Sequence, residues 1–203
     1  SEYMSEQRFY GDAFCGQIDL YGDLLGDGVP TLADLKTVGS YKALKALGLE
    51  AVDVEIGEVY KTGERKGQMK TRKEWVPGGR RDVREWALQL NAYRYLLEKE
   101  GFPVGRMVVQ LLVRDAGLEV ASRRGIDRSG YLLEINRISD IWIERYFERK
   151  AKCLYEAIWT KQMPAICKAI ERWGQDRKCR DYCAVRDVCD YAVRLNKKGN
   201  EAA

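Results

Sequence analysis

Four cysteines in the last quarter of the chain follow the spacing C-x11-C-x3-C-x5-C, and they are Cys167, Cys179, Cys183 and Cys189. The residues between them are mostly charged, so this segment has little apolar sequence from which to build a core. Four thiolates that converge on one point form a tetrahedral sulfur site, which selects zinc or an iron–sulfur cluster. A pair of disulfides is the alternative. We expect a reducing, cytoplasmic interior because no secretory signal opens the sequence and no apolar run would cross a membrane, and a reducing interior disfavours disulfides.

The composition indicates one folded domain with an appendage. The chain has 203 residues, 45% of them hydrophobic and 33% charged, as in ordinary globular proteins. Its formal net charge of +4 is no signature of nucleic-acid binding. The chain has no histidine, which excludes a histidine base and every metal site built on imidazole. The other two cysteines, Cys15 and Cys153, are expected to be buried small hydrophobes.

Hydrophobic periodicity predicts alternating strands and helices. Period-two alternation and β-branched runs predict strands over residues 14–21, 31–36, 52–61, 69–76, 107–113, 118–123 and 131–136. Apolar stripes predict helices over residues 41–47, from the capping pair Asp82 and Glu85 to Gly101, and over 138–161. This order indicates an α/β (mixed α+β) domain over residues 1–163, followed by a cysteine-held segment over 164–203.

Three residues on the first predicted hairpin form a candidate metal site. Asp34 and Lys36 are separated by one residue on a strand, so their side chains leave the same face. Asp19 lies on the neighbouring strand. Two carboxylates suit magnesium or manganese, and the lysine can orient a water or neutralise charge on a phosphoryl oxygen. The alternative is that these three residues are ordinary polar side chains on the solvent-facing side of their strands.

Two further groups are candidates for binding. Gln89 and Tyr93 lie one turn apart on a helix and project together, although a core tyrosine with a polar neighbour would show the same spacing. A run of basic residues could follow a phosphate backbone or form an ordinary solvated face. The members of this run that we predict to bind DNA are Lys61, Lys66, Lys70, Arg72, Lys73, Arg80, Arg81 and Arg84.

These motifs, taken together in their order along the chain, resemble those of a known family. The sequences G-Q-I-D (residues 16–19), D-L-K-T (34–37) and Q-L-N-A-Y (89–93), followed by the cysteines, resemble the RecB-like branch of the PD-(D/E)XK nucleases. The similarity is to members with a C-terminal iron–sulfur cluster: AddB-type nuclease domains, CRISPR-associated RecB-like exonucleases and phage relatives. It implies a restriction-endonuclease-like core in which a central mixed sheet is flanked by helices.

The resemblance also implies an activity. It implies a Mg- or Mn-dependent deoxyribonuclease that hydrolyses phosphodiester bonds, as an exonuclease on DNA ends or single strands, in a prokaryotic or phage-infected cell. Recombination or CRISPR-type proteins would be its further partners. Asp19, Asp34 and the carbonyl of Leu35 would bind the metal, Lys36 would be the catalytic lysine, and Gln89 and Tyr93 would contact DNA and brace the site.

The resemblance assigns the four C-terminal cysteines to a [4Fe–4S] cluster, with zinc as the alternative. Two features depart from the family pattern. The relatives take one cluster cysteine from upstream of the first acidic motif, and they carry a helix before that motif which often supplies another metal ligand. Glu6 is a candidate substitute for that ligand. A catalytically weak or inactive DNA-binding or scaffold protein, or a zinc-binding adaptor, is the competing interpretation.

Overall fold

The computed structural model describes residues 3–200, with side chains for residues 3–197. It divides into two compact units inside helix α4 (Asp140–Thr160), one ending at Tyr146 and the other beginning at Phe147. This division lies within the helix, whereas the sequence predicted a boundary after residue 163. None of the described helices is long and apolar enough to cross a membrane.

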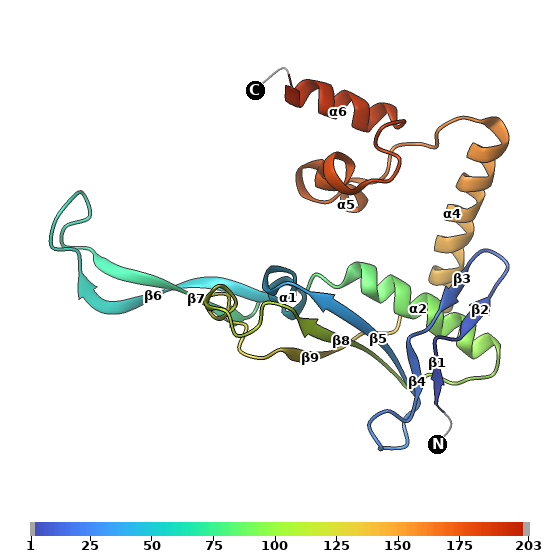
Figure 1. Cartoon of the computed structure of the whole chain (residues 1–203), viewed down its shortest axis with the longest axis horizontal. Coiled ribbons are helices and arrows are strands. Elements are labelled where there is room, and N and C mark those ends of the chain that lie inside the picture. The colour runs from blue at the N-terminus through green and yellow to red at the C-terminus, as the bar shows by residue number, and fades with distance from the viewer. Residues whose placement is uncertain (1–2, 201–203) are drawn as a thin grey trace. The chain divides into compact units, whose positions relative to one another are not determined.

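A five-stranded mixed sheet forms the centre of the first unit (Figure 1). Its strands, in spatial order, are β1 (Met4–Ser5), β4 (Leu20–Gly22), β5 (Thr31–Val38), β8 (Arg106–Val113) and β9 (Gly130–Glu134). The pair β5–β8 is parallel, and the other neighbours are antiparallel. The predicted mixed α/β architecture with a central sheet and flanking helices is therefore confirmed.

The two faces of this sheet differ. Successive side chains of a strand point to opposite faces, and Leu32, Val109 and Leu111 are buried on the face that helix α2 (Arg84–Lys99) covers. On the opposite face Leu35, Leu112 and Leu132 are each more than half exposed. Strand β8 is therefore buried along its whole length only on the helix-covered face.

Helix α1 (Ser40–Leu47) and the short helix α3 (Glu119–Ser122) build a smaller core at one end of the sheet. Ala43, Leu44 and Ala121 pack there with Val113 and Ile126. The predicted strand over 118–123 is thus wrong. Leu118 and Val120 suggested alternation, but both are exposed, and helical N–H to carbonyl bonds begin at Leu118.

Helix α2 begins without a side-chain cap. Val83 is its N-cap residue, and the predicted cap Asp82 forms an ion pair with Lys42 at 3.1 Å. The helix is anchored elsewhere, because the buried Asn91 donates to the carbonyl of Asn136 and accepts from the N–H of Ile138. Contacts of this kind fix α2 against the connection between β9 and α4.

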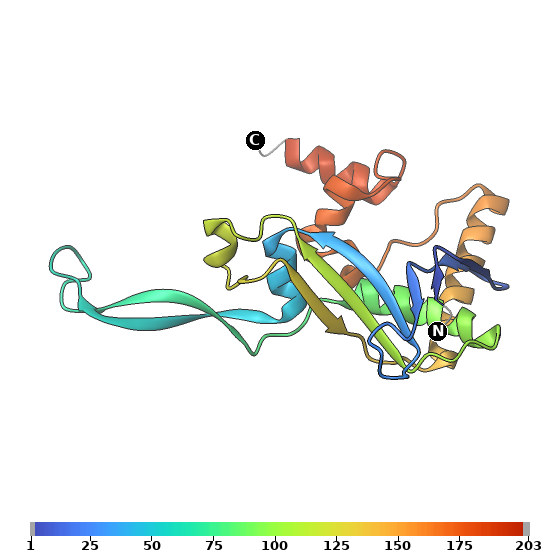
Figure 2. The same cartoon turned by 60° about the horizontal axis from the view of Figure 1, so that its bottom comes forward.

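Strands β6 (Leu49–Val59) and β7 (Met69–Pro77) pair only with each other and form an arm that extends from the sheet (Figures 1 and 2). Trp75 and Leu49 join the core of the first unit at the base of the arm. Farther out, Val54, Ile56 and Met69 are exposed. The sequence predicted both strands but not that they leave the sheet.

The predicted single strand over residues 14–21 is interrupted in the structure. Strand β3 (Cys15–Gln17) pairs with β2 (Arg8–Tyr10) in a separate two-stranded sheet, and β4 resumes after a bend at Asp19. Cys15 and Cys153 are both exposed, so their predicted burial is wrong.

The second unit contains the C-terminal part of α4 and short helical segments. These are α5 (Ala169–Arg172), η1 (Gly174–Asp176), η2 (Lys178–Tyr182) and α6 (Asp190–Asn200). Few of its described side chains are buried; Cys179 and Ala192 are among them. Polar contacts add to this small core, including the hydrogen bond from the Tyr191 hydroxyl to Asp176 at 2.9 Å.

Candidate active site

Asp34 and Lys36 form an ion pair on the helix-covered face of β5. The Asp34 side chain is only 1% exposed, whereas that of Lys36 is 25% exposed and reaches toward solvent. The Lys36 Nζ lies 3.0 Å from Asp34 Oδ1 and 2.8 Å from Oδ2, but only the contact with Oδ1 has hydrogen-bond geometry. Among the described residues, Asp34 Oδ2 is a buried oxygen without a hydrogen-bond donor. A carboxylate that is buried this deeply needs a counter-charge.

Helix α2 brings Gln89 and Tyr93 to the same carboxylate. Gln89 Nε2 donates to Asp34 Oδ1 at 3.2 Å and to the Tyr93 hydroxyl at 2.9 Å. Both amide hydrogens of Gln89 are thereby used, which fixes the orientation of its side chain. The spacing of one helical turn places the two side chains together, as expected.

Gly16 explains how Tyr93 fits so close to the sheet. A Cβ atom at Gly16 would lie 2.4 Å from Cε1 of the Tyr93 ring, a distance that real contacts do not reach. The ring therefore packs directly on the backbone of β3. The glycine of the G-Q-I-D sequence is required by this close approach and not by an unusual backbone angle.

Asp19 reaches the site from the bend between β3 and β4. Its Oδ2 accepts the backbone N–H of Leu35 at 2.8 Å, which holds the carboxylate beside the Asp34 strand. Glu6 lies next to Asp19 through a backbone bond from its N–H to the Asp19 carbonyl, at 3.3 Å. The structure nevertheless shows no group of three acidic, histidine or cysteine side chains arranged for a metal within the residues it describes, so Glu6 does not complete such a group.

Burial sets the electrostatics of Asp34. Loss of hydration raises the pKa of its carboxyl above the usual range, the hydrogen bond and charge of Lys36 oppose that rise, and the negative charge of Asp19 adds to it. The effect of burial prevails. A divalent cation between the two carboxylates would favour the ionised form of both.

This donor set fits one magnesium or manganese ion. The buried Asp34 Oδ2 and the Asp19 carboxylate, which accepts the Leu35 N–H, are oxygen donors beside the middle of β5, where the Leu35 carbonyl would be a third. Magnesium ordinarily completes its shell with water and substrate phosphate. Two protein carboxylates suffice for such a site. When bound, the ion would polarise a phosphoryl oxygen and lower the pKa of a bound water.

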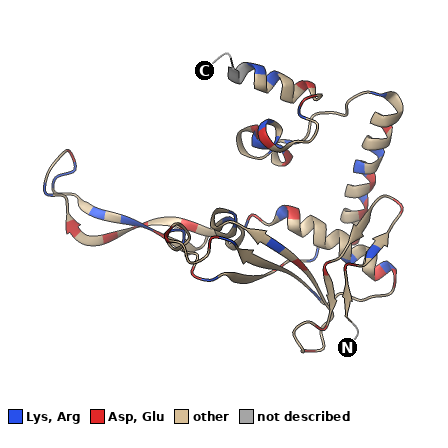
Figure 3. Ribbon diagram, viewed as in Figure 1, with Lys and Arg blue, Asp and Glu red and all other residues tan. Residues whose placement is uncertain are grey.

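The predicted basic surface is not a single face. Strand β6 carries only acidic charges, whereas β7 and the loop before it are mainly basic, so six acidic and six basic residues balance over residues 49–77 (Figure 3). Lys70 pairs with Glu58 at 2.7 Å and Arg72 pairs with Glu74, while Arg81 donates to the Glu134 carbonyl at 3.0 Å.

The other predicted DNA-binding residues lie in three places. Lys73 faces Asp53 across the arm, and Arg80 and Arg84 lie where the chain enters α2. Lys61 and Lys66 are in the exposed loop at the arm tip, together with Arg65. The tip is the part of the arm with a local excess of positive charge.

The four C-terminal cysteines lie in the second unit but do not form a ligand group in the described part of the chain. Cys179 is buried, Cys183 and Cys189 are half-buried, and Cys167 is exposed. Burial raises the pKa of the Cys179 thiol, and the charges of Cys183, Asp176 and Cys167 raise it further.

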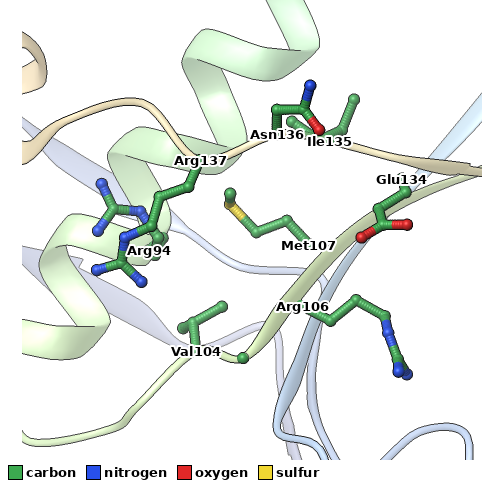
Figure 4. Close-up of a pocket in the computed structure, with 9 residues that line it drawn as sticks. Arg94, Val104, Arg106, Met107, Glu134, Ile135, Asn136 and Arg137 are labelled. Atoms are coloured by element: carbon green, nitrogen blue, oxygen red, sulfur yellow. The ribbon is translucent and has the colours of Figure 1, made fainter.

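A pocket of about 210 Å³ opens elsewhere in the first unit (Figure 4). Arg94 and Arg137 lie on one side of it, and Arg106 and Glu134 on the other (Figure 4). The fully buried Arg94 pairs with Glu98 and with Asp140, each at 2.6 Å. Arg94 follows directly after the Q-L-N-A-Y residues, but it is not among the site residues predicted from the sequence.

No protein-family model matches the sequence, and no curated protein and no solved structure matches the chain. The function therefore has to be inferred from the chain's own residues and their geometry.

Proposed function

We propose that this chain is a metal-dependent deoxyribonuclease of the PD-(D/E)XK type. The observation that carries the proposal is the buried Asp34 carboxylate, which contacts Lys36 and Gln89 and has one oxygen without a hydrogen-bond donor among the described residues. Burial of a charged group is costly, so such an arrangement on a sheet indicates a functional site. The mixed sheet is compatible with this class of nuclease.

In the proposed reaction each of these residues has a separate role. Asp34 and Asp19, with the Leu35 carbonyl, would hold one magnesium or manganese ion, which supplies charge stabilisation to the phosphoryl group. The ammonium of Lys36 would neutralise charge on a phosphoryl oxygen or orient the attacking water. Gln89 keeps Asp34 oriented through its hydrogen bond, and Tyr93 holds Gln89. Water attacks phosphorus, the P–O bond to the leaving strand breaks, and that oxygen takes up a proton.

A cleavage assay tests the proposal. End-labelled single-stranded and double-stranded DNA, and RNA of the same sequence, are incubated with Mg²⁺, with Mn²⁺ and with EDTA. We expect cleavage of DNA in either metal and none in EDTA, with products that shorten from an end if the enzyme is an exonuclease. Binding of DNA without cleavage in any metal would instead indicate a scaffold protein of the same fold.

The arm tip should contribute to DNA affinity but not to cleavage chemistry. Replacing Lys61, Arg65 and Lys66 together by glutamine should reduce the slope of log affinity against log salt by about two, because each phosphate contact contributes roughly 0.7 to 0.9 to that slope. Fluorescence anisotropy at several salt concentrations measures it. Lys70→Gln is the matched control, because Lys70 is already paired with Glu58. An unchanged slope in the triple variant would remove the arm tip from the DNA interface.

We also propose that the second unit binds a [4Fe–4S] cluster, with zinc as the alternative. Four thiols in a segment with few buried side chains support this proposal, because a cluster would stabilise a segment that lacks a core. Protein purified without oxygen should be yellow-brown, with a broad absorption shoulder in the visible range. Zinc would leave it colourless.

Replacing any one of the four cysteines by alanine should bleach the protein and make its C-terminal segment more sensitive to limited proteolysis. The controls are Cys15→Ala and Cys153→Ala, which should change neither property, since both cysteines lie outside the C-terminal set. Bleaching by Cys15→Ala would assign a ligand to the N-terminal strands and contradict the proposed set.

A further inference from the structure

The Lys36 ammonium lies next to the Asp34 carboxylate. It lies within 3.0 Å of both oxygens, and Gln89 contacts only Oδ1. Of the contacts described for Asp34 Oδ2, that with Lys36 alone supplies a positive charge. A magnesium ion bound to Oδ2 would lie roughly 2.1 Å from it. The ammonium and the metal therefore compete for the same side of one buried carboxylate.

The two cations are alternatives for electrostatic reasons. Asp34 cannot lose its counter-charge while it is buried and ionised. Once a doubly charged ion is bound, the ammonium is repelled and no longer needed there. The Lys36 side chain is 25% exposed, so its end has space to move toward solvent, where a phosphate would approach.

We propose that Lys36 is an internal counter-ion that competes with the divalent metal for Asp34, so that metal binding displaces its ammonium from the carboxylate toward the scissile phosphate. The inference rests on the proposed function. It adds that the lysine required for cleavage weakens metal binding. Lys36 holds the metal-free site together, and metal binding makes it available for catalysis.

A quantitative consequence follows for Lys36→Met, which keeps the length of the side chain and removes its charge. A single and a double positive charge about 6 Å apart in water repel each other enough to change an affinity about tenfold. Lys36→Met should therefore bind Mn²⁺ about tenfold more tightly than the wild type while losing cleavage. Lys36→Arg, which keeps the charge, should bind Mn²⁺ like the wild type.

Mn²⁺ binding is measured on the full chain by the electron paramagnetic resonance signal of free Mn²⁺, with no DNA present. The variants are Lys36→Met, Lys36→Arg, Asp34→Asn and, as a matched control, Lys42→Met, whose lysine pairs with Asp82 outside the site. Each titration is repeated at about pH 7.5 and about pH 9, because competition from protons for a metal-binding carboxylate weakens with rising pH.

The outcomes separate the inference from the proposed function. If Lys36→Met is the only variant that binds Mn²⁺ more tightly than the wild type, at both pH values, the inference is supported. Equal or weaker binding by Lys36→Met, together with loss of binding by Asp34→Asn, overturns the inference but leaves the metal site in place. Binding by Asp34→Asn equal to that of the wild type, or no binding by any variant, overturns the metal site and the inference with it.

Discussion

Asp34→Asn should lower metal-dependent DNA cleavage by about a thousandfold or more while the protein stays folded. The substitution keeps the shape of the side chain and its hydrogen bond from Gln89, but it removes the anionic oxygen on which the proposed metal depends. Single-turnover cleavage of end-labelled DNA in Mn²⁺ measures the loss. Glu119→Gln is the control, because Glu119 is exposed on α3 and pairs only with Arg123 among its described ion-pair contacts. A variant that retains a tenth of wild-type activity would contradict a metal at Asp34.

The same substitution should stabilise the metal-free protein. Burial raises the pKa of the Asp34 carboxyl in the folded state, so the folded protein binds a proton there more tightly than the unfolded chain does. Stability of the wild type therefore falls as the pH rises from the unfolded pKa through the folded pKa. In EDTA at neutral pH we expect Asp34→Asn to be more stable by about 1 kcal/mol, and this gain should disappear in acid. Urea denaturation at several pH values measures it, and a less stable variant at neutral pH would show that the ionised carboxylate is well compensated by Lys36.

Arg94→Met should destabilise the first unit by about 3 to 5 kcal/mol, a large part of the stability of a typical domain. Arg94 is fully buried and pairs with Glu98 and Asp140, and it donates to the carbonyl of Ile138 at 3.0 Å. The substitution removes one donor from each of these acceptors at the junction of α2 with the start of α4, and of the three only Glu98 keeps a second described arginine partner, Arg137. Urea denaturation followed by tryptophan fluorescence measures the change, with an unchanged slope as the sign that the unfolding mechanism is the same.

Arg137→Met is the matched control for this prediction. Arg137 also pairs with Glu98, but its side chain is 53% exposed. Exposed ion pairs contribute little, so we expect a loss below about 1 kcal/mol. Equal losses for the two variants would mean that burial does not set the strength of this network.

The local elements around the site could be predicted from the sequence because their signals are short-range. Alternation and the turn before residue 31 identified the hairpin that carries Asp34 and Lys36, and helical spacing placed Gln89 beside Tyr93. The burial of Asp34 could not be predicted. An acidic residue on a strand is usually exposed, whereas Asp34 is buried on the face that α2 covers, where Gln89 and Lys36 contact it.

Long-range contacts account for three differences between the predicted and the observed structure. The strand through Cys15 breaks at Asp19 because the chain passes from one sheet to another, which no local pattern signals. Asp82 was predicted to cap helix α2. It instead forms an ion pair with Lys42, which is far away in the sequence. The basic residues between 61 and 84 looked like one surface because only the folding of the hairpin sets the acidic strand β6, which precedes them in the sequence, against the basic strand β7.

The most direct test of the metal site is to locate Mn²⁺ by anomalous scattering in crystals of the wild-type protein grown with Mn²⁺. We predict one anomalous peak roughly 2.1 Å from Asp34 Oδ2, shared with the Asp19 carboxylate and the Leu35 carbonyl, with the Lys36 ammonium moved away from Asp34. A structure in which Lys36 still contacts both Asp34 oxygens, with Mn²⁺ absent or bound elsewhere, would contradict the account.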